Sequence, residues 1–220
     1  IIIPVYNEAA VIAQTLHEVM KTGYGVVVVD DGSTDGTRSI VQTFPVYYLH
    51  HPVNIGQGGA LQTGMEFAKR HNASAVIHFD ADGQHKASDI RQLLHPILND
   101  ECDVVFGSRF LQHKDSHLPF FRKMFLQLAR YINWLFTGIL LTDAHNGLRA
   151  LNRKALQAIN FTENKMAHAS EILWLIKEHR LTYREVPVTI EYTAYSRNKG
   201  QSLWNSINII FDLLFKKINR

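Results

Sequence analysis

The sequence has a single cysteine, Cys102, so no disulfide can form within the chain. A lone thiol fits a reducing compartment, and beside an apolar run it is most simply a small buried hydrophobe. An excess of charge is also missing, because the formal net charge is only +3, which does not indicate a nucleic-acid-binding protein. What remains is 220 residues with 46% hydrophobic content, enough for one well-buried core.

Several common signatures are missing as well. No P-loop Gly-Lys-Ser/Thr occurs, and the dinucleotide pattern G-x-G-x-x-G that starts at Gly56 fails at its sixth position, Leu61. These glycines are expected either to let the backbone approach a nucleotide or to begin the next helix without side-chain crowding. Residues 120–141 are nearly long enough to cross a bilayer, but polar residues every three or four positions predict an amphipathic helix.

In the first half, strand-like and helix-like segments alternate. Apolar runs predict strands and helical spacing predicts helices, which together indicate an α/β protein with a mostly parallel central sheet flanked by helices. The expected strands are residues 1–5, 26–29, 46–49, 76–79 and 104–106, and the expected helices are residues 11–20, 37–43, 56–70 and 88–98. A later helix around Glu171 leads to a strand at residues 183–188.

The last segment, Ser202 to Lys217, predicts an amphipathic helix with a wide apolar face. Trp204 lies near one end of it, and Lys216 and Lys217 lie at the other. Such a face suits peripheral contact with a membrane surface, and it equally suits a homodimer seam or a membrane-protein partner.

Two acidic clusters carry the chemistry of the first half. Residues 30–36 (DDGSTDG) and residues 80–85 (DADGQH) each follow a predicted strand directly. In a parallel sheet, ligands bind beyond the carboxyl ends of the strands, so both clusters point to one crevice. Carboxylates at i and i+2 suit a hard divalent cation whose open positions are filled by substrate phosphates. The residues therefore indicate a diphosphate site, although either cluster alone also fits an ordinary turn.

Two other metal sites fit poorly. The first cluster resembles the start of an EF-hand, but its twelfth position is Gln42 where a bidentate Glu is needed. The second has His85 at the sixth position and Arg91 at the twelfth. The twelve histidines lack the paired spacings of zinc sites.

Five motifs in order resemble the inverting family-two glycosyltransferases, and within them the dolichyl-phosphate mannose synthase-like branch. They are Pro4–Glu8, Asp30–Thr37, Asn54–Gly56, Asp80–Gln84 and Gly107–Arg109. Further segments extend the resemblance over nearly the whole chain: residues 143–150 are similar to D-x-x-S-G-F-R-A with Asn146 in place of Ser, residues 183–188 to the branch's E-V-P-I strand, and residues 197–202 to its R-x-x-G-x-S close.

The resemblance implies a fold and a set of roles. The fold is a single GT-A-type, Rossmann-like domain over residues 1–220, with a nucleotide-sugar half (1–109), an acceptor and membrane-facing half (110–220) and C-terminal amphipathic helices. The implied donor-binding residues are Pro4, Tyr6, Glu8, Val29, Asp31, Asn54, Gly56, Asp80 and Ala81. Asp80, Asp82 and Gln84 are the implied ligands of Mg²⁺ or Mn²⁺.

Phosphate contacts are implied for Arg109, Arg122 and Arg197, because the guanidinium fork pairs well with phosphate oxygens. The branch carries Lys directly after its final Ser, whereas this chain has Leu203, so Lys199 is expected to supply that contact. The Q-x-x-R-W motif of processive polysaccharide synthases is absent, which argues against polymerisation.

The expected activity is metal-dependent transfer of one sugar, with inversion, from a GDP- or UDP-sugar to a polyprenyl phosphate such as dolichyl or undecaprenyl phosphate. The expected location is the cytoplasmic face of the membrane, with peripheral attachment. The expected catalytic residues are Asp82 and Arg109, together with Asp143 and then Glu171 as the base if the acceptor is a hydroxyl. Two alternatives stay open: a glycan hydroxyl acceptor in cell-surface polysaccharide synthesis, and an inactive donor-binding partner of a membrane protein.

Overall fold

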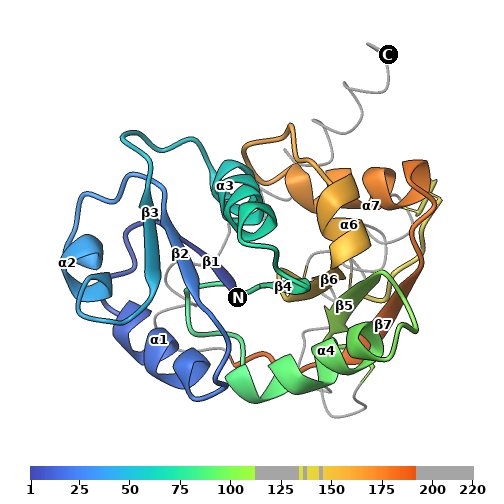
Figure 1. The fold of residues 1–220 in the computed structure, drawn as a ribbon, viewed down its shortest axis with the longest axis horizontal. Coiled ribbons are helices and arrows are strands. Elements are labelled where there is room, and N and C mark those ends of the chain that lie inside the picture. Colours follow the sequence, from blue (N-terminus) through green and yellow to red (C-terminus); the bar gives the residue numbers. More distant parts are fainter. Residues whose placement is uncertain (112–133, 136–137, 144–145, 192–220) are drawn as a thin grey trace, which may run out of the picture.

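The computed structural model describes residues 1–111, 134–135, 138–143 and 146–191 (Figure 1). Its centre is a seven-stranded sheet with strand order β3-β2-β1-β4-β6-β5-β7. The strands are β1 (Ile2–Val5), β2 (Val27–Asp30), β3 (Tyr47–His50), β4 (Ala75–His78), β5 (Val104–Ser108), β6 (Arg149–Asn152) and β7 (Tyr183–Pro187). The helices are α1 (Ile12–Met20), α2 (Thr37–Val41), α3 (Gln57–Arg70), α4 (Ile90–Leu98) after a 3₁₀ turn at Ala87–Asp89, α6 (Arg153–Ala158) and α7 (His168–Glu178).

The sheet is mostly parallel, as predicted, with one reversed strand. β6 pairs antiparallel with both of its neighbours, β4 and β5, while the pairs β1–β2, β2–β3, β1–β4 and β5–β7 are parallel. The segment of β6 lies in a motif of the sequence, at residues 143–150, for which no strand was predicted. Because β6 runs backwards, it begins at the edge of the sheet where the parallel strands end.

Helices cover both faces of the sheet. In Figure 1, α3, α6 and α7 lie above it and α1 and α4 lie below it. Strand side chains alternate between the two cores: Ile2, Val29 and Phe106 belong to the α3 side, whereas Ile3 and Val28 belong to the α1 side. Since both faces are covered, the strands β1, β2, β4 and β5 are largely apolar, as a buried parallel sheet requires.

Predictions for the second half agree only in part with the structure. Trp134 and Leu135 are helical, but residues 138–143 are not, so the helix expected over 120–141 ends earlier than predicted. Gly138, at φ +74°, adopts the left-handed conformation that commonly ends a helix. The predicted helix Ser202 to Lys217 lies outside the described residues. None of the helices in the described ranges is both long and apolar enough to span a membrane.

One buried carboxylate stabilises the edge of the sheet at which β5 and β7 begin. Asp103, 6% exposed, accepts hydrogen bonds from Asn152 Nδ2 (3.0 Å), Lys154 Nζ (2.9 Å), and both the backbone N and the hydroxyl of Thr182 (2.8 and 3.0 Å). Burial alone would raise the pKa of Asp103, but these hydrogen bonds lower it from 3.8 to about 2.

Asp103→Asn is therefore expected to destabilise the protein near pH 7 by about 2 kcal/mol, because each pKa unit corresponds to about 1.4 kcal/mol. The folded-state pKa is depressed, so the stabilisation exists above about pH 4 and is lost as the pH falls toward 2. The free energy of unfolding in urea, measured for the wild type and Asp103→Asn from pH 7 to pH 2, should differ at neutral pH and become equal in acid. The exposed Asp100→Asn is the control, and a constant gap between the wild-type and Asp103→Asn curves would contradict this role.

Candidate active site

The predicted site residues that follow β1, β2 and β4 lie at one edge of the sheet. β1, β2 and β4 run parallel, so the segments after Val5, Asp30 and His78 leave the sheet on the same side. The reversed β6 begins there too, since Arg149 is opposite His78 in β4. The strand order reverses at β1, between β2 and β4, and such a switch point is where open α/β sheets bind ligands.

In the first acidic cluster, Asp31 holds the loop before α3. Its carboxylate accepts the backbone N–H groups of Ile55 (3.0 Å) and Gly56 (2.7 Å) and lies 2.8 Å from Nδ1 of His51. An ionised carboxylate can only accept, so Nδ1 of His51 carries a proton. Asp31 itself is only 3% exposed, whereas Asn54 in the loop is exposed. A nucleotide-sugar would therefore contact the loop, which Asp31 holds in place from below the surface.

The rest of this cluster forms the turn that the sequence left open as an alternative. Asp30, fully buried, accepts the N–H of Ser33 (2.8 Å) and the hydroxyl of Tyr48 (2.5 Å). Burial and this bond to Asp30 raise the pKa of Tyr48. Asp35 accepts the N–H groups of Ala9 and Thr37, which ties the loop after β1 to the loop after β2. Asp30 and Asp35 therefore stabilise the turn, and the donor-binding role of Asp31 stays a prediction.

The second acidic cluster brings Asp80, Asp82 and Gln84 together after β4. Asp82 accepts the backbone N–H of Gln84 (3.0 Å) and its side-chain Nε2 (2.8 Å), which leaves the Gln84 amide oxygen as an acceptor. Asp80 Oδ1 accepts Nε2 of Gln57 (2.8 Å), and Asp80 Oδ2 lies 3.0 Å from Nε2 of His85. The predicted metal ligands thus share one short loop.

The two carboxylates of this loop have opposite pKa shifts. Burial would raise the pKa of Asp80, but the hydrogen bond and charge of His85, together with the Arg149 guanidinium, lower it below its ordinary value. Burial raises the pKa of Asp82, and the neighbouring charge of Asp80 raises it further. A cation placed between them would relieve this repulsion.

These residues fit a hard divalent cation. Asp80, Asp82 and Gln84 offer only oxygen atoms, which Mg²⁺ and Mn²⁺ prefer. Within the described part of the chain, no group of three His, Cys, Asp or Glu residues could hold a metal, so the remaining ligands would come from water or substrate phosphates. That is the usual arrangement for magnesium bound through one or two carboxylates.

Gly147 makes room for the Asp80 carboxylate. A Cβ added at Gly147 would lie 2.1 Å from Oδ2 and 2.9 Å from Oδ1 of Asp80. No real contact is that short, so any side chain there must displace the carboxylate. The motif that supplies Gly147 belongs to the segment before the reversed β6, which explains how residues so distant in the sequence meet.

Arg109 and Asp143 form a partly buried ion pair beyond β5. Asp143, 4% exposed, accepts the Nε of Arg109 (2.6 Å), its Nη2 (3.2 Å) and its backbone N–H (3.2 Å). Glu185 accepts the backbone N–H groups of Thr142 and Asp143 and so fixes this loop from β7. The pairing makes Asp143 the residue that orients Arg109, and both of its carboxylate oxygens are occupied by these hydrogen bonds.

Glu171 serves a different segment. From the first turn of α7 its carboxylate accepts the N–H and hydroxyl of Thr162 (3.1 and 2.5 Å) and the N–H of Glu163 (2.9 Å). Among the described residues it forms no hydrogen bond or ion pair with another predicted site residue. Its role as a second candidate base stays a prediction.

The glycines at the start of α3 allow close packing against the protein's own backbone. A Cβ at Gly56 would lie 2.3 Å from the carbonyl oxygen of Asn164, and one at Gly58 would lie 2.0 Å from that of Glu163. The N–H of Gly59 also donates to the Asn164 carbonyl (3.1 Å). Of the two roles expected for these glycines, the structure shows relief of crowding at the helix start.

A buried arginine, Arg149, lies near Asp80 together with two buried histidines, His78 and His168. Arg149, 1% exposed, keeps its charge although burial lowers its pKa to about 10. Burial and the Arg149 charge lower the pKa of His78 to about 3 and that of His168 to about 4, so both imidazoles are neutral at neutral pH. One fixed positive charge thus offsets the charge of Asp80 from inside the fold. Sequence reasoning missed Arg149, although it lies in a quoted motif.

The other residues predicted to bind the nucleotide-sugar differ in how far they are exposed to solvent. Tyr6 is 43% exposed beyond β1, whereas Glu8 and Ala81 are 8% and 4% exposed. Pro4 and Val29 are buried within strands, so a donor could meet them only through the backbone or a small edge. These roles stay predictions. Arg122, Arg197 and Lys199 lie outside the described residues.

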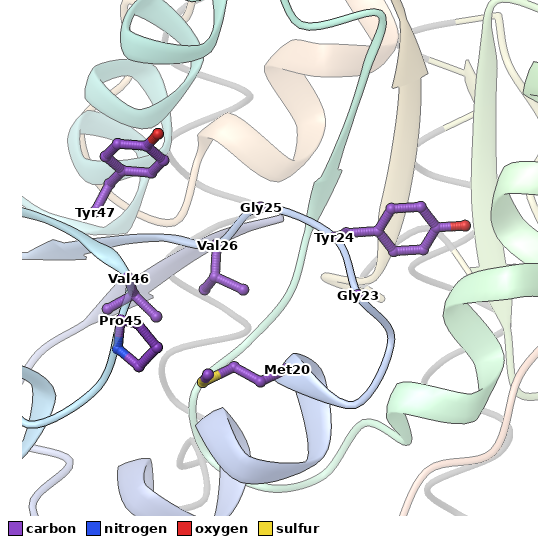
Figure 2. A pocket seen from close by; sticks show the side chains of 8 residues that line it. All are labelled: Met20, Gly23, Tyr24, Gly25, Val26, Pro45, Val46 and Tyr47. Carbon is purple, nitrogen blue, oxygen red and sulfur yellow. The ribbon is translucent and has the colours of Figure 1, made fainter.

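A hollow of about 400 Å³ lies at the opposite edge of the sheet, where β2 and β3 begin (Figure 2). Its walls carry no charged side chain that could bind a diphosphate or a metal, and in Figure 2 the rings of Tyr24 and Tyr47 point in different directions. The lining residues are Met20, Gly23, Tyr24, Gly25, Val26, Pro45, Val46 and Tyr47. The charged and polar residues at the other edge, Asp80, Asp82 and Arg109 among them, are therefore the better candidates for chemistry.

The chain is similar to several known proteins. The model of one protein family, Glycosyl transferase family 2, matches residues 1–159. A UDP-N-acetylglucosamine–dolichyl-phosphate N-acetylglucosaminyltransferase of Methanococcus voltae is 31% identical over 241 residues, covering 100% of this chain and 96% of that protein. An undecaprenyl-phosphate mannosyltransferase of Micrococcus luteus is 31% identical, covering 91% of this chain and 85% of that protein.

A solved structure confirms the fold. Glucosyl-3-phosphoglycerate synthase from Mycobacterium tuberculosis, in complex with Mn²⁺, UDP and glucosyl-3-phosphoglycerate, matches with a TM-score of 0.74. The match covers 97% of this chain and 76% of that chain at 17% sequence identity. The predicted GT-A-type, Rossmann-like architecture is therefore correct, and at this identity the likeness concerns architecture alone.

Proposed function

The chain belongs to glycosyl transferase family 2 and is a glycosyltransferase, and from this premise we propose that it moves one sugar, with inversion, from a nucleotide-sugar to a polyprenyl phosphate in a metal-dependent reaction. The observation that carries the proposal is the Asp80/Asp82 pair at the switch point of the sheet. The names of the relatives from Methanococcus voltae and Micrococcus luteus support a lipid-phosphate acceptor.

The leaving nucleoside diphosphate develops negative charge as the sugar departs. A Mg²⁺ or Mn²⁺ ion held by Asp80, Asp82 and Gln84 would act as a Lewis acid that neutralises this charge. Asp143 holds the guanidinium of Arg109 in one orientation, so its positive charge is already in place near the end of β5, where the donor phosphates are proposed to lie. Asp31 fixes the loop at residues 54–56, against which the nucleoside is proposed to lie.

The hydrogen bonds of Asp143 favour an anionic acceptor over a hydroxyl. A hydroxyl acceptor must lose a proton to a nearby base, whereas a phosphate monoester of a polyprenol is already ionised near neutral pH. Asp143 accepts three hydrogen bonds from Arg109, two from its guanidinium and one from its backbone N–H. Glu171 accepts hydrogen bonds from Thr162 and Glu163. With both candidate bases committed elsewhere, attack by a pre-ionised phosphate on the face opposite the leaving group needs no further residue.

A transfer assay tests this proposal. The purified full chain would be given UDP-GlcNAc, UDP-glucose or GDP-mannose with vesicles that contain a polyprenyl phosphate, with Mn²⁺ or with EDTA. We expect lipid-extractable labelled sugar from at least one donor, and none with EDTA. Peripheral attachment at the cytoplasmic face is part of the proposal, so the protein should also co-sediment with anionic vesicles at low salt. Labelled product only on a glycan hydroxyl would overturn the acceptor assignment.

A further inference from the structure

The orientation of Asp80 is set by two side chains outside the predicted site. Nε2 of Gln57 donates to Oδ1 (2.8 Å), and Nε2 of His85 donates to Oδ2 (3.0 Å). The two donors come from different segments, since Gln57 is the first residue of α3 and His85 follows the acidic loop. Each carboxylate oxygen has a second lone-pair site, so both can still face a cation.

The backbone that carries Gln57 is fixed on both sides. The two preceding residues, Ile55 and Gly56, donate their N–H groups to Asp31. The two following residues, Gly58 and Gly59, lie against the backbone of Glu163 and Asn164. The Gln57 amide therefore reaches Asp80 from a rigid support and does not need to be ordered when a ligand binds.

We propose that Gln57 is a positioning residue for the metal site. It connects Asp80 to the loop at residues 54–56, which Asp31 holds. The inference rests on the proposed function, because it requires a cation at Asp80 and Asp82. An amide is suited to this task, since it fixes the rotamer of Asp80 without adding a charge that would compete with the cation. Partners of this kind, which orient metal ligands, commonly change metal affinity by 10- to 100-fold when they are removed.

The test is the affinity for Mn²⁺ alone, measured by electron paramagnetic resonance with no nucleotide present. Gln57→Leu keeps the approximate size of the side chain but donates no hydrogen bond, and we expect Mn²⁺ to bind roughly tenfold more weakly. Gln57→Asn keeps the amide but is one methylene shorter, so it should weaken binding in the same direction. Gln14→Leu, an identical change at an exposed position on α1, is the matched control and should bind Mn²⁺ as the wild type does.

Two further readouts separate positioning from general damage. The unfolding temperature of Gln57→Leu should stay close to that of Gln14→Leu, and transfer by Gln57→Leu should recover in part as the Mn²⁺ concentration is raised. If the wild type binds Mn²⁺ and Gln57→Leu binds it equally well, the inference about Gln57 is wrong and the metal site stands. If the wild type binds no Mn²⁺, the metal site itself is wrong and the inference falls with it.

Discussion

Asp82→Asn is expected to lower sugar transfer by on the order of a thousandfold while the protein stays folded. The change removes a charged metal ligand, and loss of several kcal/mol of charge stabilisation corresponds to that factor. The fold should not suffer, because burial and the charge of Asp80 already disfavour the ionised form of Asp82. Transfer assays at fixed Mn²⁺, with circular dichroism and thermal unfolding on the same samples, provide the measurement.

Asp100→Asn is the matched control for this variant. Asp100 is exposed, and at φ +54° it adopts a conformation that Asn tolerates well. It should transfer sugar at the wild-type rate. Near-wild-type turnover by Asp82→Asn would remove Asp82 from the metal site, and a large loss of unfolding temperature would show that its role is structural.

Gly147→Ala should be almost as damaging, although it adds only one methyl group. The new Cβ would lie 2.1 Å from Oδ2 of Asp80, so the carboxylate must turn away from the position that Gln57 and His85 give it. Misplacement of a reacting group by about 1 Å can cost roughly a hundredfold in rate, and we expect at least that loss of transfer. The overpacking should also lower stability by about 1–3 kcal/mol.

Gly25→Ala is the control, because nothing lies within 4 Å of a Cβ built there. It should leave transfer and unfolding temperature unchanged. Chemical denaturation of both variants then separates the stability loss of Gly147→Ala from its loss of activity. Full activity of folded Gly147→Ala would mean that the orientation of Asp80 is unimportant for the reaction.

The part of the site that follows parallel strands could be predicted from the sequence. Asp31, Asp80 and Asp82 come directly after apolar runs, and the rule that such strands end at one edge places them together without any structure. The residues before β6 could not be located in this way. Gly147 lies just before a strand that runs backwards and Arg149 is its first residue, so a rule that considers only the residues after strands passes over both.

Side-chain pairing within the site was beyond the sequence for a different reason. Gln57 lies 23 positions before Asp80, and only the packing of α3 brings its amide to that carboxylate. Likewise, the sequence around Asp143 reads the same whether Asp143 is a free base or the partner of Arg109. A pattern of residue types states which chemistry is available, and hydrogen-bond partners decide which of it is used.

The reversed strand also affects how the chain folds as it is made. β5 follows β4 in the sequence but does not pair with it, because β6 lies between them. The edge of β4 therefore has no partner until residues 149–152 are synthesised, roughly 4–14 s later at about 5–20 residues per second. An unpaired apolar edge invites pairing with other chains. Substitutions that prevent β6 from pairing should thus appear first as aggregation of nascent protein. Molecular chaperones that shield β4 during this interval would determine the yield of folded protein.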